Sequence, residues 1–334
     1  MVIIPESDKS ESMKKYISLL FTGVLLLSAC QHDVIHEIDY NITLDQENTY
    51  YAGEPVKFNI TGNVENLVFY SGETGSQYVY KDRYSVPLED VISANLHLDV
   101  QARYGDAGAL EIYVSKDFAG INGNDDPDGD RAAVKAMVEA GMPGWVKLDY
   151  QEGASTKWTA QDFNMTEYLE NLCIAFHWCP KAIDKTQRTY WINGEISIEM
   201  QGTEPSKMKL SDLGFQNLMM NEEVDAYKKN AGNGSIRFDN ATNAGQICFQ
   251  GVGANALPYA IDAWVFTSPR PLNKVANDKG TVIKNLENYM HEYVYTWDQP
   301  GTYKVVFVGR NENYAHASEQ IHEYTITILE KKIE

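Results

Sequence analysis

Short strand-like segments separated by turn residues set the strongest limit on how this chain can fold. They are rich in Val, Ile, Tyr, Phe and Thr, and Gly, Asn, Asp and Pro lie between them. Examples are PVKFNI at 55–60, LEIYVS at 110–115 and TYKVVFVG at 302–309. The best helix candidate, RAAVKAMVEAG at 131–141, ends at a glycine with a proline shortly beyond. The sequence therefore predicts an all-β fold of antiparallel sandwiches with little helix.

The N-terminal segment has the pattern of an export signal. Lys14 and Lys15 supply positive charge, and an apolar stretch of about a dozen residues follows at 16–27, too short to span a bilayer. Ser28 and Ala29 provide the small residues that a signal peptidase needs before its cut. We expect residues 1–29 to be a signal peptide region that is absent from the mature protein.

The stretch LSAC at 27–30 resembles the lipobox of bacterial lipoproteins, in which the cysteine is lipidated and becomes the mature N-terminus. The resemblance implies a lipid on Cys30, a true start at Met13 and a lipid-anchored linker at 30–35. An ordinary signal peptide with a chance cysteine is the alternative. Acidic residues at 33, 37 and 39 are similar to the export signal of surface-exposed Bacteroidetes lipoproteins. We therefore expect an outer-membrane protein, lipid-anchored and exposed on the cell surface.

The two ends of the mature chain each hold about half of a sandwich. The stretch 50–75, which contains GEPVKFNITG, resembles the front half of a PKD or immunoglobulin-like domain, and 293–311, which contains PGTYKVVFVG, resembles the back half. We expect residues 36–83 plus 276–334 to form one split Ig/PKD-like β-sandwich. Two separate small β modules are the alternative.

The middle of the chain, residues 84–275, is expected to be an inserted domain. ALEIYVSKDFAG at 109–120 and the segment 172–200 resemble jelly-roll β-sandwich modules of galactose-binding or cleaved-adhesin type. Asn193-Gly194 replaces the acidic pair that is usual in the second motif. This departure weakens any transfer of a metal role to that position.

The mature chain as a whole resembles a family of uncharacterised Bacteroidetes outer-membrane lipoproteins. The stretches that carry the resemblance are GEPVKFNITGNVENLVFYSGETGSQYVYKDR, VSKDFAG and, near the C-terminus, YVYTWDQPGTYKVVFVGRNENY. Such proteins resemble the surface glycan-binding lipoproteins of Sus-type polysaccharide-utilisation loci. The resemblance implies capture of a polysaccharide or oligosaccharide beside a SusC/SusD-type transporter complex.

Charge and motif content limit the other function classes. The net charge of −19, from 47 acidic and 28 basic residues, argues against nucleic acid or an anionic lipid surface as the partner. The chain has no G-x-S-x-G, H-E-x-x-H, phosphate-loop or C-x-x-C motif, so we expect no enzyme. An adhesin-like or structural protein-binding lipoprotein is the first alternative, and a divergent glycoside hydrolase is a lower one.

Tryptophans are the candidate glycan-binding residues, because flat aromatic faces pack against sugar C–H groups while polar neighbours bond the hydroxyls. We rank Trp158 first, since it lies in a polar stretch that reads as a loop. Trp191 follows, because alternation places it on the side opposite to the apolar residues Tyr190 and Ile192. Trp145 is third. Packing in a sandwich core is the alternative for each.

The stretch NGNDDPDGD at 122–130 is the most polar cluster in the chain. Asn124, Asp126, Asp128 and Asp130 alternate and could supply oxygen ligands to calcium, the one cofactor that the sequence suggests. The alternative is a solvated turn in which Asp130 caps the helix that follows.

Three cysteines remain after lipidation, namely Cys173, Cys179 and Cys248. An odd number in an exported chain leaves at least one free thiol. Alternation places Cys173, His177 and Cys179 on one strand face, but their spacing is not that of a zinc knuckle. Buried thiols with one satisfied histidine, or a disulfide from Cys173 or Cys179 to Cys248, are the open alternatives.

Overall fold

The computed structural model describes residues 37–45, 49–153, 157–180, 187–222, 237–239, 246–251, 260–312 and 316–331. The signal peptide region, the linker and Cys30 lie outside these residues. Within the described part, no helix has the length and apolar character that a membrane span requires.

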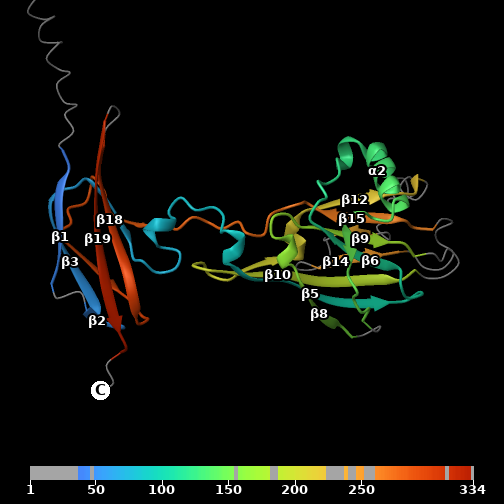
Figure 1. Ribbon diagram of the computed structural model, residues 1–334, viewed down its shortest axis with the longest axis horizontal. Coiled ribbons are helices and arrows are strands. Elements are labelled where there is room, and N and C mark those ends of the chain that lie inside the picture. The colour runs from blue at the N-terminus through green and yellow to red at the C-terminus, as the bar shows by residue number, and fades with distance from the viewer. Residues whose placement is uncertain are drawn as a thin grey trace, which may run out of the picture. The chain divides into compact units, whose positions relative to one another are not determined.

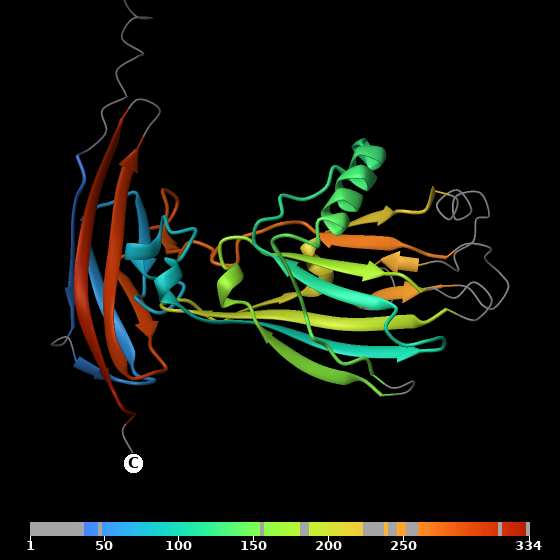
Figure 2. The ribbon, with the colours of Figure 1, turned by 45° about the vertical axis from the view of Figure 1, so that its right-hand side comes forward.

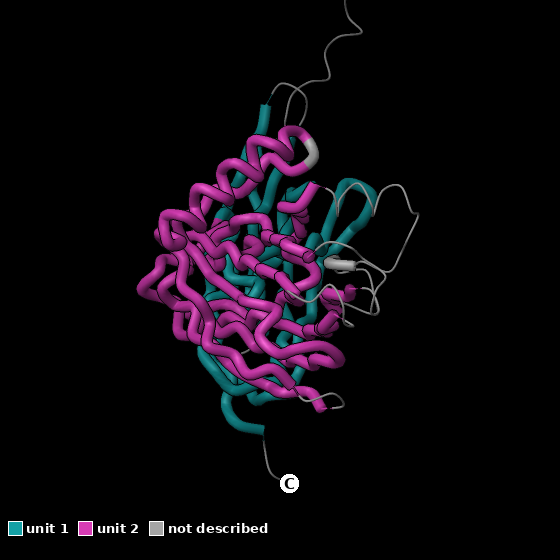
Figure 3. The backbone as a smooth tube through the Cα atoms, turned by 90° about the vertical axis from the view of Figure 1, so that its right-hand side faces the viewer, with its two compact units in different colours: residues 1–82, 278–334 teal, residues 83–277 magenta. Residues whose placement is uncertain are grey.

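The chain divides into two compact units (Figure 3). Unit 1 consists of residues 1–82 and 278–334, and unit 2 consists of residues 83–277. Each unit has its own hydrophobic core. Unit 1 is therefore assembled from two segments that are distant in the sequence.

Unit 1 is a β-sandwich (Figure 1). One sheet contains, in spatial order, β1 (Asp39–Leu44), β3 (Pro55–Asn63) and β17 (Glu292–Thr296). The other contains β16 (Thr281–Lys284), β4 (Asn66–Tyr70), β18 (Gly301–Glu312), β19 (Ala317–Leu329) and β2 (Thr49–Tyr51). All pairs are antiparallel except β19 with β2. In both sheets, strands of the N-terminal segment pair with strands of the C-terminal segment.

The core of unit 1 is aromatic. Phe58, Phe69, Trp297 and Phe307 are fully buried, and Phe58 lies in edge contact with Phe307 at 5.0 Å between ring centroids. Three of them come from β3, β4 and β18, and Trp297 directly follows β17. The packing therefore unites the two chain segments as well as the two sheets.

Unit 2 is a second sandwich (Figure 2). Its long-strand sheet contains β13 (Arg237–Asp239), β14 (Ile247–Gln250), β10 (Thr189–Met200), β5 (Val91–Arg103) and β8 (Thr159–Asn164), with β11 (Ser206–Lys209) also paired to β10. Its helix-covered sheet contains β12 (Phe215–Met219), β15 (Ala263–Thr267), β9 (Cys173–Trp178), β6 (Leu110–Ser115) and β7 (Trp145–Lys147).

Strand β9 is buried on both sides. Phe176 and Trp178 pack between the two sheets, and Cys173 and Ala175 point the other way into a second cluster beneath α2 (Pro127–Glu139). That cluster also contains Val134 of the helix. Part of the outer side of this sheet is thus covered by α2 (Figures 1 and 2).

The start of α2 corrects the helix limits expected from the sequence. The expected start was Arg131, with Asp130 as the cap, but the helix begins at Pro127 and Asp126 is the N-cap. The Asp126 carboxylate accepts a hydrogen bond from the backbone N–H of Gly129 at 3.0 Å. Proline suits the first helical position, because its missing N–H would have no partner inside the helix. At the other end, Gly141 adopts a positive φ of 80° after the helix, as the sequence indicated.

Strands dominate the described residues, and α2 is the one α-helix described along its whole length. Five short 3-10 turns complete these elements: η1 (Tyr78–Tyr80), η2 (Leu88–Asp90), η3 (Gly123–Asp125), η4 (Thr166–Tyr168) and η5 (Leu210–Leu213). The prediction of an all-β fold of the Ig-like and jelly-roll class is confirmed.

Candidate functional site

Trp191 lies on the outer side of the long-strand sheet. It pairs with Gln101 of β5, while Tyr190 and Ile192 beside it are fully buried in the core. The guanidinium of Arg103 lies over the Trp191 ring, 5.2 Å from its centroid. A cation on an aromatic face is attracted by the ring quadrupole, so Arg103 holds the ring in place.

Trp158 comes to the same side of the same sheet. It directly precedes Thr159, the first residue of β8, which pairs with Val100 of β5. The strand alternation places Trp158 with the exposed residues Ala160 and Asp162. Its side chain is 39% exposed. The sequence placed Trp158 in a polar loop, and Trp158 lies just outside the edge strand, directly before its first residue.

We call this surface the tryptophan face and define it as Trp158, Trp191, Arg103, Gln101, Asp99, His97 and Asn193. In the register of the sheet, Trp191 lies opposite Gln101 and Asn193 lies opposite Asp99. Since adjacent strands are about 4.8 Å apart, the strand positions of Trp158 and Trp191 are about 10 Å apart across β5. The face therefore presents two indoles with the partly exposed polar side chains of His97, Asp99 and Asn193 on the same side, whereas Gln101 is buried.

The polar groups of the tryptophan face are held in defined positions. The Nδ1 atom of His97 lies 2.8 Å from Asp162 Oδ1, and its Nε2 lies 3.9 Å from Asp99 Oδ2. Arg103 Nε is buried and has no hydrogen-bond acceptor within the described part of the chain. The His97 and Asp99 side chains suit hydroxyl groups, which both give and accept hydrogen bonds, whereas the buried Arg103 Nε is not accessible to a ligand.

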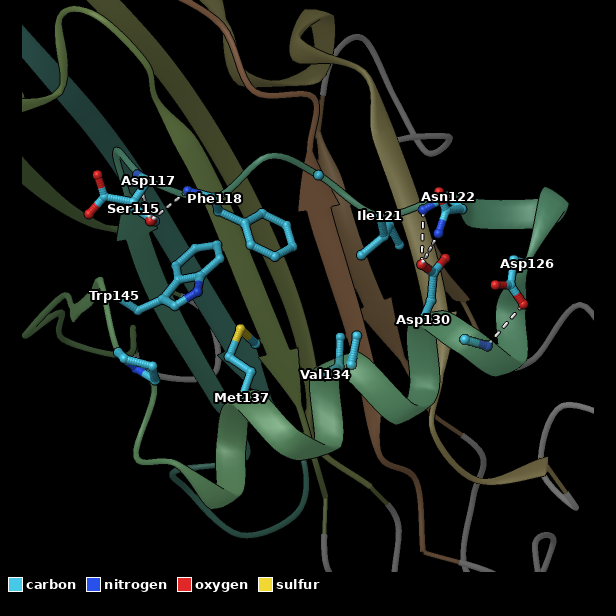
Figure 4. A pocket seen from close by; sticks show the side chains of 14 residues that line it. Ser115, Asp117, Phe118, Ile121, Asn122, Asp126, Asp130, Val134, Met137 and Trp145 are labelled. Atoms are coloured by element: carbon cyan, nitrogen blue, oxygen red, sulfur yellow. Dashed lines mark hydrogen bonds between the residues drawn. The ribbon is translucent and has the colours of Figure 1, made fainter.

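Trp145 lies on the other sheet, in a pocket between α2 and the helix-covered sheet. We call it the α2 pocket; its volume is about 460 Å³. Asp117 and Ser115 lie at one end beside Trp145 and Phe118, and Asp126 and Asp130 lie at the other (Figure 4). Ile121, Val134 and Met137 form the apolar middle.

The segment that carries Asp117 and Phe118 is held by Ser115. The Ser115 hydroxyl is buried and accepts hydrogen bonds from the backbone N–H groups of Asp117 and Phe118, both at 3.2 Å. These two hydrogen bonds to the Ser115 hydroxyl fix a turn directly after β6. The residues belong to the stretch VSKDFAG at 114–120, so a sequence signal was present, but it did not identify Asp117 or Phe118 as pocket residues.

The predicted calcium residues have partners of their own. Both carboxylate oxygens of buried Asp130 accept hydrogen bonds, from the backbone and side-chain N–H groups of Asn122 and from the backbone N–H of Gly123. Asp126 caps α2, and Asp128 pairs with Arg131 at 2.5 Å. No group of three or more His, Cys, Asp or Glu side chains in the described ranges is arranged to hold a metal. The side chain of Asn124 lies outside the description, and calcium remains a prediction.

The cysteines do not form the disulfides considered from the sequence. Cys173 and Cys179 are both free thiols, which excludes a bridge from either to Cys248. Cys173 is buried under α2, and burial raises the pKa of its thiol to about 12. It is therefore a neutral packing residue at ordinary pH.

His177 forms a charged cluster that the sequence did not indicate. Its Nδ1 lies 3.2 Å from Glu111 Oε2, its Nε2 lies 2.9 Å from Asp262 Oδ1, and its ring stacks on Trp264 at 4.2 Å. Burial alone would lower the pKa of His177, but the hydrogen bonds to Asp262 and Cys179 outweigh it and raise the pKa to about 10. Both ring nitrogens are committed to carboxylates, so neither is available to act as a base.

The N-terminal third of the chain has a match among known families. Residues 29–126 match the family described as Domain of unknown function (DUF5017). The matched segment covers less than half of the chain and includes β1 to β6 and Asp117 and Phe118 of the α2 pocket. No curated protein matches the chain.

Proposed function

We propose that this chain binds polysaccharide on the tryptophan face and does not cleave it. The observation that carries the proposal is the shared position of Trp158 and Trp191 on one sheet side, with the Arg103 guanidinium over the Trp191 ring. Sugar rings pack their C–H faces on indoles and satisfy their hydroxyls at neighbouring polar groups. An open sheet side suits a polymer, because the polysaccharide can extend beyond the binding site at both ends.

The cellular setting is a further part of the proposal. We propose that Cys30 carries a lipid, that the protein lies on the outer surface of the outer membrane, and that it delivers glycan to a SusC/SusD-type transporter. The LSAC stretch supports the anchor. A Cys30→Ser variant should leave the membrane fraction, and protease added to intact cells should digest the wild-type protein. Full protection from protease would place the protein on the periplasmic side and contradict surface capture.

The binding proposal is tested by affinity electrophoresis through gels that contain neutral or acidic polysaccharides. The glycan that retards the wild-type protein is then used in titration calorimetry. We expect Trp158→Ala and Trp191→Ala each to weaken binding about tenfold, which corresponds to about 1.4 kcal/mol. The reason is that each substitution removes one stacking surface while most of the polar groups remain.

Trp145→Ala is the matched control, because it removes an indole from the other sheet. Its affinity for the polysaccharide should equal that of the wild type. Circular dichroism spectra should confirm that all three variants are folded. Retardation by no polysaccharide, or equal losses in all three variants, would contradict the proposed face. Release of reducing ends during the titration would instead indicate a glycoside hydrolase.

A further inference from the structure

The α2 pocket is separate from the tryptophan face. The pocket opens on the outer side of the helix-covered sheet, whereas the tryptophan face belongs to the long-strand sheet. Its volume of about 460 Å³ lies within the range of about 300–1,000 Å³ that is typical of small-molecule sites. The function proposed for the tryptophan face does not use it.

The charged side chains that line the α2 pocket are all negative. Three carboxylates contribute, from Asp117, Asp126 and Asp130, and the described lining residues include no Lys, Arg or His. Two of the three charges are partly offset, because Asp130 accepts backbone N–H groups and Asp126 caps the positive end of the helix dipole. An anionic ligand would meet repulsion at both ends of the pocket.

Asp117 differs from the other two carboxylates. Its side chain is exposed, and no described residue donates a hydrogen bond to its carboxylate or forms an ion pair with it. Gly144 lies beside it with φ of 76°, and a Cβ at that position would be 3.4 Å from Asp117 Oδ2. The pocket therefore has one lining carboxylate that is exposed and available to a ligand.

Two aromatic rings stand beside that carboxylate. The Phe118 and Trp145 ring centroids are 5.0 Å apart, and both rings line the pocket next to Asp117 (Figure 4). Both side chains are only partly buried. Aromatic faces attract ammonium groups, and a carboxylate close by adds charge pairing.

We propose that the α2 pocket binds a small organic cation, with its ammonium group at Asp117 and its apolar body against Trp145 and Phe118. The apolar middle, formed by Ile121, Val134 and Met137, receives the rest of the ligand. A bare metal ion fits less well, because Asp117 is the one lining carboxylate that is not already bonded within the described chain. The ammonium could belong to a free amine or to an amino sugar.

The test uses matched pairs of probes and reads tryptophan fluorescence and calorimetric heat. The first pair is phenethylammonium and the neutral 2-phenylethanol; the second is a glucosamine oligosaccharide and its N-acetylated form. We expect the cation of at least one pair to bind at least tenfold more tightly than its neutral counterpart. A preference for phenethylammonium indicates that the ligand is a free amine. A preference for the glucosamine oligosaccharide indicates that it is an amino sugar.

Substitutions then test whether Asp117 is the carboxylate that binds the ammonium group. Asp117→Asn and Trp145→Ala should each weaken cation binding about tenfold, while Asp125→Asn should not, because Asp125 is exposed nearby but does not line the pocket. Trp191→Ala should also leave cation binding unchanged, which separates this site from the polysaccharide site. Equal affinity for charged and neutral probes, no binding of any probe, or equal losses in Asp117→Asn and Asp125→Asn would overturn the proposal.

Discussion

At the scale of single residues, His177 shows how tertiary contacts can reverse the effect of burial. Its imidazole is largely buried, and desolvation alone would favour the neutral form. Asp262 and Glu111 lie at the two ring nitrogens, and Trp264 stacks beneath the ring. The hydrogen bonds from Lys147, Tyr113 and His177 outweigh burial at Glu111 as well and lower its pKa to about 2. The His177 imidazole therefore stays positively charged and the Glu111 carboxylate stays negatively charged at neutral pH.

This cluster predicts a loss of stability at alkaline pH. The pKa of His177 in the folded protein, about 10, lies above the ordinary histidine value of about 6.5. The contribution of His177 to the stability of the folded protein is therefore complete below about pH 6.5 and is lost as the pH rises through about 10. Urea unfolding of the wild type and of His177→Gln should differ by about 2 kcal/mol at pH 6 and converge towards pH 10. A difference that is constant with pH would contradict a charged imidazole.

Gly194 is a second residue whose identity depends on packing. It lies inside β10, and a Cβ at this position would be 2.7 Å from Leu210 Cδ2 and 3.1 Å from Leu98 Cδ2. The sequence showed only that Asn193-Gly194 departs from a related motif. The close approach of Leu210 gives the physical reason for the glycine.

Gly194→Ala should therefore destabilise unit 2 by about 1–3 kcal/mol, because the added methyl overpacks the core. The measurement is urea unfolding, with Asn193→Ala as the neighbouring control. Asn193 lies on the outer face, so its substitution should change the free energy of unfolding by less than about 0.5 kcal/mol. Equal effects of the two substitutions would contradict this packing argument.

At the scale of elements, β8 had only a weak strand signal in the sequence. It occupies one edge of the long-strand sheet of unit 2 and reads TAQDFN, with little apolar alternation. Because an edge strand faces solvent along one side, its composition is only weakly constrained by the core. This is the reason that the sequence did not indicate a strand directly after Trp158.

Helix α2 makes a testable prediction about its first turn. Asp126→Ala should destabilise unit 2 by about 1 kcal/mol, because the N–H of Gly129 loses its acceptor. The control is Asp125→Ala, which neutralises an exposed neighbour without removing the cap. Thermal unfolding should be measured with calcium and with a chelator. A large stabilisation by calcium that disappears in Asp126→Ala would support the predicted calcium site, and calcium-independent curves would favour the cap alone.

At the scale of the whole molecule, the two units have separate cores, and one is built from a single chain segment whereas the other is built from two. Unit 2 is continuous, whereas unit 1 is closed by pairing β4 with β18 and β3 with β17. The two connections of unit 1 lie close together, since the N–H of Asp278 donates to the Tyr80 carbonyl at 3.2 Å and its carboxylate accepts from the Gln77 N–H. Contacts within unit 1 therefore do not require the residues between 83 and 277.

We expect unit 1 to fold when Asp82 is joined to Asp278 through a short Gly-Ser linker. The buried Trp297 should give blue-shifted fluorescence, and urea unfolding should be cooperative. A control in which the N-terminal segment 37–82 is expressed alone should be unfolded, because its strands lack β17, β18 and β19. An unfolded fusion would show that unit 1 depends on unit 2.

The sequence by itself determined the strand content, the alternation that turns Trp191 outward, and the glycine that follows α2. These features are local, because strand alternation and helix ends depend on neighbouring residues. Only the tertiary structure decided that α2 covers the outer side of β9, that Trp158 and Trp191 share one face, and that Asp117, Phe118 and Trp145 line one pocket. These arrangements depend on which strands pair and in what register, and contacts between distant residues carry no pattern within any one segment.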